Sequence, residues 1–311
     1  MKPLDFEKPL YDILEKIKEL EANPNLKDNV NSLKIEAEKL KNNIYSNLTR
    51  WQVVQIARHP DRPKSIDYLN NVFDEFLELH GDRLFSDDKA IITGIAKIEK
   101  FSIAFIAQEK GRSTSEKIER NFGMPHPEGY RKGMRIMELA EKLKLPLITF
   151  VDTPGAYPGV GAEERGQFSA IAYSIMKMLS LKTYTISYII GEGGSGGALA
   201  IAVADRVFAF EYSIYSVISP EGCASILFRD ASKASEAAEV LKLTAKDLLD
   251  FGVIDGIVKE PIGGAHWDPK LMYSTLKEHI ISQIEELTKI PLEEVLERRY
   301  KKYRNMGIIY G

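Results

Sequence analysis

The chain has 311 residues, of which 44% are hydrophobic, with a formal net charge of -3 and a sequence pI of about 6.1. This length and composition suffice for one large domain or two modest ones. The charge balance argues against nucleic acid as the main partner, because phosphate binding needs a clustered excess of Lys and Arg. Cys223 is the only cysteine, so neither an internal disulfide nor a thiolate zinc site can form, and we expect a cytoplasmic protein.

Nothing in the sequence predicts membrane insertion. The first twenty residues are dense in Asp, Glu and Lys and lack the apolar core of a signal peptide. The longest apolar run, residues 198–204, is far shorter than the ~20 residues that cross a bilayer.

Two amphipathic helices are predicted at the start of the chain. Apolar residues lie at helical spacing from Leu10 to Leu20, residues 23–25 (Asn-Pro-Asn) interrupt them, and a narrow heptad seam follows from Leu26 to Leu48. This pattern predicts an antiparallel helical hairpin over residues 1–50, followed by one main domain over residues 51–311. Because such a seam cannot be buried by the hairpin alone, we expect it to pack on the main domain or on another subunit.

The main domain begins with a predicted amphipathic helix over residues 66–80, followed by strands over residues 90–98 and 102–107 that can pair as a hairpin. From there helices and apolar strands alternate. The predicted helices cover residues 128–144, 163–179 and 198–204, and the predicted strands cover residues 146–151, 183–190, 206–210, 214–218 and 253–258. Continuous apolar strands separated by helices indicate an α/β fold, with a parallel sheet covered on both faces.

The segment GEGGSGGALA, residues 191–200, is the most informative one. It joins a strand to a helix of small and aliphatic residues, and we predict a tight loop over residues 191–197. Glycines allow another molecule to approach the main chain closely. The first N–H groups of a helix lack internal partners, and the helix dipole is positive there. The sequence therefore predicts a backbone site for a negatively charged oxygen.

Two other interpretations of this segment stay open at the sequence level. Gly191, Gly193 and Gly196 satisfy the dinucleotide-binding pattern G-x-G-x-x-G, and Glu211 lies about twenty residues further on. Against it, the following helix is short and wholly apolar, and five glycines in seven residues exceed what the pattern needs. The segment could also be a purely structural turn.

A second loop, residues 152–161 (DTPGAYPGVG), also follows a buried strand and precedes a helix. Loops at the carboxyl ends of parallel strands are where α/β proteins bind ligands, although a plain surface loop would have the same composition. Upstream, residues 108–130 carry basic side chains that could meet an anion or be solvated, and His126, which could be a general base. The basic residues are Lys110, Arg112, Lys117 and Arg120. No hydrolase triad is indicated.

Four long blocks carry a family likeness. They are NFGMPHPEGYRKG (121–133), ITFVDTPGAYPGVGAEERGQ (148–167), IIGEGGSGGALAI (189–201) and YSVISPEGCASILF (215–228). Together with ARHPDRP (57–63), they resemble the alpha subunit of the carboxyltransferase component of bacterial and plastid acetyl-CoA carboxylase, over essentially the whole chain.

The resemblance implies a crotonase-like fold built from ββα units, and an alpha2beta2 heterotetramer with a beta subunit. Carboxybiotin would arrive on a separate biotin carboxyl carrier protein, with biotin carboxylase in the wider complex. The beta subunit would supply most of the acetyl-CoA site and carry a zinc ribbon, so no metal is expected on this chain. The implied reaction gives malonyl-CoA, the first committed step of fatty acid synthesis.

The resemblance also implies the site residues. The amides of Gly196 and Gly197 would stabilise the negative charge on the ureido oxygen of biotin, and no side-chain base would be needed. The residues implied to line the surrounding cleft are Gly193, Gly194, Ser195, Gly155, Tyr157, Pro158, Gly159, Gly161, Ser219, Pro220, Glu221 and Gly222.

Two alternative functions remain at this level. The chain could belong to a propionyl-CoA-type carboxylase or a biotin-dependent acyl-CoA decarboxylase, which share the fold and the oxyanion chemistry. It could also be a catalytically silent scaffold that binds its partner through the N-terminal helices.

Overall fold

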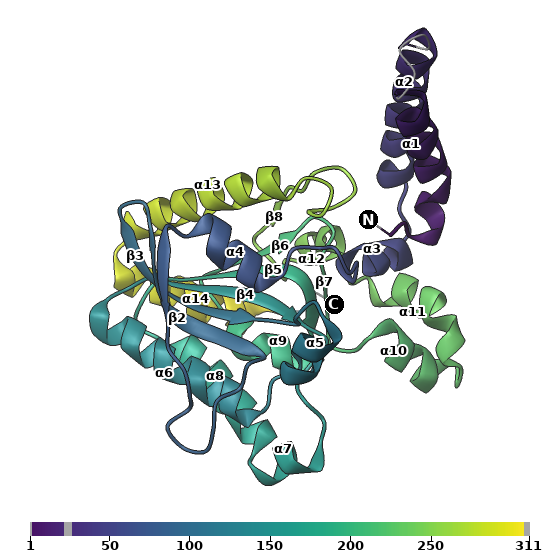
Figure 1. Ribbon diagram of the computed structural model, residues 1–311. Helices are drawn as coiled ribbons and strands as arrows, with labels where there is room; N and C mark the ends of the chain where they lie inside the picture. Colours follow the sequence, from purple (N-terminus) through teal and green to yellow (C-terminus); the bar gives the residue numbers. More distant parts are fainter. Residues whose placement is uncertain (1, 22–26, 308–311) are drawn as a thin grey trace.

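A computed structural model describes residues 2–21 and 27–307 of the chain. The two predicted N-terminal helices are confirmed as α1 (Lys8–Glu21) and α2 (Lys27–Ser46), which pack along each other and project from the body (Figure 1). The predicted break at residues 23–25 lies outside the described residues. At the base of the hairpin the Tyr45 ring meets the rings of Tyr212 and Trp267 edge-on, so the hairpin does pack on the rest of the chain. That residues 1–50 form a separate domain stays a prediction.

The predicted helix over residues 66–80 is wrong in its second half. After α3 (Arg50–Ala57), α4 (Ser65–Val72) ends early because the backbone becomes extended at Phe73, and β1 (Glu75–Glu78) follows. β1 pairs antiparallel with β2, and the Phe76 side chain packs edge-on against Phe105. The apolar residues of this short segment fit an edge strand as well as a helix face, and strand pairing decides between them.

The central sheet combines the predicted antiparallel hairpin with the predicted parallel strands. β2 (Ile91–Ile98) and β3 (Phe101–Gln108) form the antiparallel hairpin, and β4 (Leu147–Thr153), β5 (Thr185–Gly194), β6 (Arg206–Phe210) and β8 (Gly256–Val258) continue the sheet in parallel. The strand order is β1-β2-β3-β4-β5-β6-β8. A short strand, β7 (Ile214–Ser216), lies outside this order and pairs with the carboxyl end of β5. β7 and β8 are shorter than the strands predicted at residues 214–218 and 253–258.

Helices cover both faces of the sheet, as predicted (Figure 1). On one face α6 (Pro127–Leu143), α8 (Gln167–Ser180) and α9 (Ser195–Ala202) contribute to one apolar core, and on the other α4 and α13 (Pro269–Thr288) contribute to a second. The helix predicted over residues 163–179 is split into α7 (Val160–Glu164) and α8, because Gly166 is left-handed with φ of 79°. The remaining α-helices are α5 (Thr114–Glu119), α10 (Pro220–Leu227), α11 (Ala234–Leu241), α12 (Ala245–Asp250) and α14 (Leu292–Asn305).

Candidate active site

The glycine-rich segment is a strand end followed directly by a helix. β5 runs as far as Gly194, and α9 begins at Ser195. The predicted tight loop over residues 191–197 is therefore wrong, and the helix predicted over residues 198–204 begins three residues earlier and ends at Ala202.

Hydrogen bonding and close packing explain why this glycine segment is extended. Gly193 pairs with Thr153 of β4 on one side and with Tyr215 of β7 on the other, so the segment forms part of the sheet. A Cβ atom on Gly194 would lie 2.2 Å from the carbonyl oxygen of Pro154. Glycine is needed at Gly194 for this close approach between strand and loop.

The same geometry removes the dinucleotide interpretation. That fingerprint places its glycines in a tight turn after the strand, whereas Gly191 and Gly193 lie within β5. Glu211, the candidate ribose ligand, instead pairs with Lys259 at 2.6 Å and accepts the Glu260 N–H.

The chain changes abruptly from strand to helix at the start of α9. Ser195 has φ of 51°, a left-handed conformation that costs a non-glycine residue about 1–3 kcal/mol and makes the change from strand to helix abrupt. Gly196 and Gly197 are the second and third residues of α9, and the first N–H groups of a helix have no partner within it. These amides lie at the positive end of the helix dipole and can bind a negatively charged oxygen.

The loop after β4 meets the α9 start, as expected of two ligand loops. A Cβ atom on Gly197 would lie 2.6 Å from the Ala156 nitrogen, 2.7 Å from the Gly155 carbonyl carbon and 3.0 Å from the Tyr130 hydroxyl. That hydroxyl is buried and has no hydrogen-bond partner within the described residues. The Ala156 nitrogen, which the sequence analysis did not single out, therefore lies beside Gly197; its only sequence signal was its place next to Gly155.

The rest of this loop leads away from the α9 start. The Tyr157 ring packs on His126 at 4.2 Å, and the Tyr157 N–H donates to the Pro125 carbonyl. Pro158 leads into α7, where Gly159 lies against Tyr157 and Gly161 against Arg165. His126 lies 3.4 Å from an Arg165 nitrogen and caps the start of α6, so its surroundings give no support for the predicted role as a general base.

The segment Ser219 to Gly222 lies at the other side of the β5 end. Ser219 caps α10 by accepting the Gly222 N–H at 3.1 Å. Ser219 and Pro220 share a small cleft with Gly193 and Gly194, which brings together these predicted cleft residues. Glu221 is not free to bind a ligand, since its carboxylate accepts from the Arg58 guanidinium at 2.6 Å.

A cluster of ionised side chains supports this strand end, and sequence reasoning missed it. Glu192 binds Lys110 at 2.8 Å and Arg58 at 2.8 Å, and Lys110 also binds Asp152 at 2.7 Å. The Asp152 carboxylate in turn accepts the Glu192 N–H at 2.9 Å. Burial would raise the pKa of Glu192, but Lys110 and Arg58 lower it to about 2, so it stays ionised.

Three of the four basic residues that could meet an anion bind protein groups instead. Lys110 belongs to the ion cluster just described, Arg112 pairs with Asp67, and Arg120 donates to the Lys89 carbonyl. Lys117 lies in the last turn of α5, half-buried. None of these four side chains is shown against the start of α9, which instead meets main-chain groups of residues 154–156, the Tyr130 hydroxyl, the Gln108 amide and Ile171.

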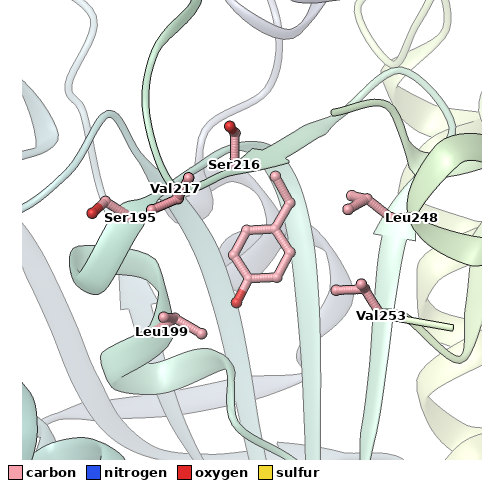
Figure 2. Close-up of a pocket in the computed structure, with 7 residues that line it drawn as sticks. Ser195, Leu199, Ser216, Val217, Leu248 and Val253 are labelled. Atoms are coloured by element: carbon pink, nitrogen blue, oxygen red, sulfur yellow. The ribbon is translucent and has the colours of Figure 1, made fainter. Parts of the chain in front are cut away.

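An apolar pocket of about 230 Å³ lies beside the α9 start (Figure 2). Ser195 and Leu199 line it from α9, and Ser216 lines it from β7. The other lining residues are Tyr215, Val217, Leu248 and Val253. An apolar part of a ligand can therefore be accommodated next to the site for a negatively charged oxygen.

Comparison with known proteins decides the family. Residues 3–307 match the family model described as "Acetyl co-enzyme A carboxylase carboxyltransferase-like". The acetyl-coenzyme A carboxylase carboxyl transferase subunit alpha of Geobacter metallireducens is 55% identical over 308 residues, covering 98% of this chain and 97% of that protein. The chain belongs to this alpha-subunit family. The subunit of the same name from Geobacter sulfurreducens is 58% identical over 272 residues, covering 88% of this chain and 85% of that one.

Solved structures confirm the predicted crotonase-like carboxyltransferase fold for this alpha-subunit family member. A transcarboxylase 12S with methylmalonyl-coenzyme A bound has a TM-score of 0.59 at 18% identity and covers 76% of this chain, which spans 45% of the transcarboxylase chain. A chain of a Pseudomonas malonate decarboxylase hetero-tetramer has a TM-score of 0.55 at 15% identity. The match covers 68% of this chain and 85% of the decarboxylase chain. The names of these relatives favour an acetyl-CoA carboxylase subunit over a subunit of a propionyl-CoA-type carboxylase or of an acyl-CoA decarboxylase.

Membrane-spanning helices and metal-binding clusters are both absent from residues 2–21 and 27–307. No helix there is both long and apolar enough to cross a membrane. The same residues contain no group of three or more His, Cys, Asp or Glu side chains placed to hold a metal ion.

Proposed function

We propose that this chain is the carboxybiotin half of an acetyl-CoA carboxylase carboxyltransferase, which acts with a beta subunit in the cytoplasm to form malonyl-CoA. The observation that carries the proposal is the position of Gly196 and Gly197 in the first turn of α9, where N–H groups lack partners within the helix, in a chain of the alpha-subunit family. The lone Cys223, which is buried and unpaired, fits a reducing compartment.

The surroundings of Gly196 fit a bound oxygen. A Cβ atom there would meet only the Ile171 Cγ2 at 3.4 Å, so the remaining side of Gly196 is open to a ligand. Carboxybiotin, brought by a separate carrier protein, would supply the carboxyl group. The Gly196 and Gly197 amides would stabilise the charge on the ureido oxygen by about 3 kcal/mol each.

The other predicted cleft residues have supporting roles in this proposal. Gly194 lets the strand end approach Pro154 of the loop, Gly193 lets the Tyr215 ring pack against β5, and Ser195 makes the abrupt change to the helix. The predicted role of Gly155 stays a prediction. Ser219 and Pro220 border the same strand end, while Glu221 is held by Arg58. The predicted substrate-binding roles of Tyr157, Pro158, Gly159, Gly161 and Gly222 stay predictions.

A beta subunit would bind over the exposed face of α8. Phe168 is 72% exposed and Tyr173 and Met176 are each 61% exposed, although all three are large and apolar. Contiguous exposed apolar side chains mark protein interaction sites. Because Ile171 of the same helix lies next to Gly196, a partner bound here would complete the site from the side. The full assembly we propose is alpha2beta2, served by the biotin carboxyl carrier protein and biotin carboxylase, with zinc on the beta subunit only.

We expect Met176→Glu to weaken binding of the beta subunit at least about tenfold, because a charge would be buried in an apolar interface. Titration calorimetry or analytical ultracentrifugation would measure the change. Leu271→Glu, at a position that is 51% exposed on α13 across the sheet, is the matched control and should bind normally. Equal affinities for both variants would place the beta subunit elsewhere.

The function is tested by reconstitution. The purified chain alone should give no biotin-dependent turnover of malonyl-CoA, and addition of its beta subunit should restore it, because the acyl-CoA side lies on the partner. Faster turnover of methylmalonyl-CoA than of malonyl-CoA would favour a propionyl-CoA-type enzyme. Full activity of the chain alone would contradict the half-site proposal.

A further inference from the structure

A glycine-rich helix start needs an external support to hold its amides in one orientation. Gly194, Gly196 and Gly197 give this turn a large freedom of backbone rotation. Stabilisation of a developing charge depends on donors that are already oriented before the reaction. Some other part of the chain must therefore fix the first turn of α9.

Gln108, at the end of β3, makes that contact. Its side-chain amide Nε2 donates to the Gly197 carbonyl at 2.7 Å, and its Oε1 accepts the Asp152 N–H at 3.2 Å. The residue is fully buried, and its own carbonyl accepts a hydrogen bond from Ser65 at 2.5 Å. One side chain thus ties the first turn of α9 to the end of β4, where the loop carrying Ala156 begins.

We infer that Gln108 is a positioning residue for carboxyl transfer, which orients the first turn of α9 and sets its distance from the loop after β4. This inference rests on the proposed function. Gln108 acts through Gly197 and has no contact with a reacting group of its own.

Two other side chains donate to carbonyls of α9, and they provide the control. Thr149 donates to the Ile201 carbonyl at 2.8 Å, and Ser174 donates to the Ala200 carbonyl at 2.6 Å. Both bonds are buried, as is the bond from Gln108, but they hold the end of the helix that is remote from the amides. The Thr149 hydroxyl also bonds the Ser187 hydroxyl at 2.9 Å, so Thr149→Val, like Gln108→Met, removes two buried hydrogen bonds, but away from the first turn.

The test compares Gln108→Met, Gln108→Glu and Thr149→Val in the complex with the beta subunit, with malonyl-CoA and free biocytin as substrates. Gln108→Met loses both hydrogen bonds, and Gln108→Glu places an oxygen against the Gly197 carbonyl. We expect kcat to fall about tenfold to a hundredfold in both variants, with an unchanged KM for malonyl-CoA. Thr149→Val should lower the melting temperature by a similar amount while kcat stays at the wild-type value.

The outcomes separate this inference from the proposed function. A kcat loss in Thr149→Val as large as in the Gln108 variants would show that Gln108 only stabilises the fold, and would overturn the inference. Normal kcat in the Gln108 variants, with Gly196→Val inactive in the same assay, would also overturn it and leave the proposed function intact. Normal turnover by Gly196→Val would contradict the proposed function itself.

Discussion

Replacing Gly196 with valine is expected to lower kcat for carboxyl transfer about a hundredfold or more while the chain stays folded. The added side chain would meet the Ile171 Cγ2 at 3.4 Å, an ordinary contact, and otherwise extend into open space. That open space is where a ligand oxygen would approach the amides. The variant would be assayed in the assembled enzyme, with the melting temperature measured alongside.

Gly196→Ala gives the sharper version of this test. Alanine in place of a helical glycine is expected to raise the free energy of unfolding by up to about 1 kcal/mol, because Gly196 does not have a positive φ. Transfer should nevertheless fall, by less than in the valine variant. A variant that is more stable and less active cannot be explained by damage to the fold. Wild-type kcat and KM in both variants would show that this amide pair does not bind the reacting oxygen.

Gly196 and Gly197 cannot be told apart in the sequence, but they differ in the structure. A Cβ atom on Gly197 would lie within 2.7 Å of main-chain atoms of both Gly155 and Ala156. A substitution there would displace the loop as well as obstruct the site, so loss of activity in Gly197→Val would be uninformative. One glycine is required for packing and the other leaves room for a ligand, a distinction that depends on residues about 40 positions away in the chain.

The fold was predictable from local pattern wherever burial dominated. β4 is buried along its whole length, and β6 coincides with its predicted span. Two errors fall where pairing with a distant strand decides the conformation: at β1, which needs β2, and at Gly193, which needs both β4 and β7. The hydrophobic periodicity and the composition of a short stretch of sequence carry no information about which distant strand will pair with it.

The ion cluster at the end of β5 was missed for the same reason. Arg58 and Glu192 are 134 positions apart, and Lys110 and Glu192 are 82 positions apart. In the sequence Glu192 is a single acid among glycines, and Lys110 is one of several basic residues in a polar loop. Only the sheet brings them together, where they are shielded from water.

We expect Lys110→Met to lower the free energy of unfolding by about 3–5 kcal/mol at neutral pH. Lys110 lies between Asp152 and Glu192, at 2.7 Å and 2.8 Å, and its side chain is only 15% exposed. Its removal takes away the ion pair of Asp152 and leaves Glu192 paired with Arg58 alone. Urea unfolding would measure the loss. Lys89→Met is the control, since Lys89 and Glu119 form a solvent-exposed pair, and its effect should be below about 1 kcal/mol.

The loss in Lys110→Met should depend on pH in a defined direction. In the wild-type chain the pKa of Glu192 is lowered from 4.5 to about 2, so its ionisation stabilises the fold fully above about pH 4.5 and is lost as pH falls towards 2. Without Lys110 that pKa rises and the contribution becomes smaller, because Arg58 is then the only cation paired with Glu192 among the described residues. The difference between the two chains should therefore be constant from about pH 7 to pH 5 and shrink at about pH 4. A difference that grows on acidification would mean that Glu192 does not depend on Lys110 for its charge.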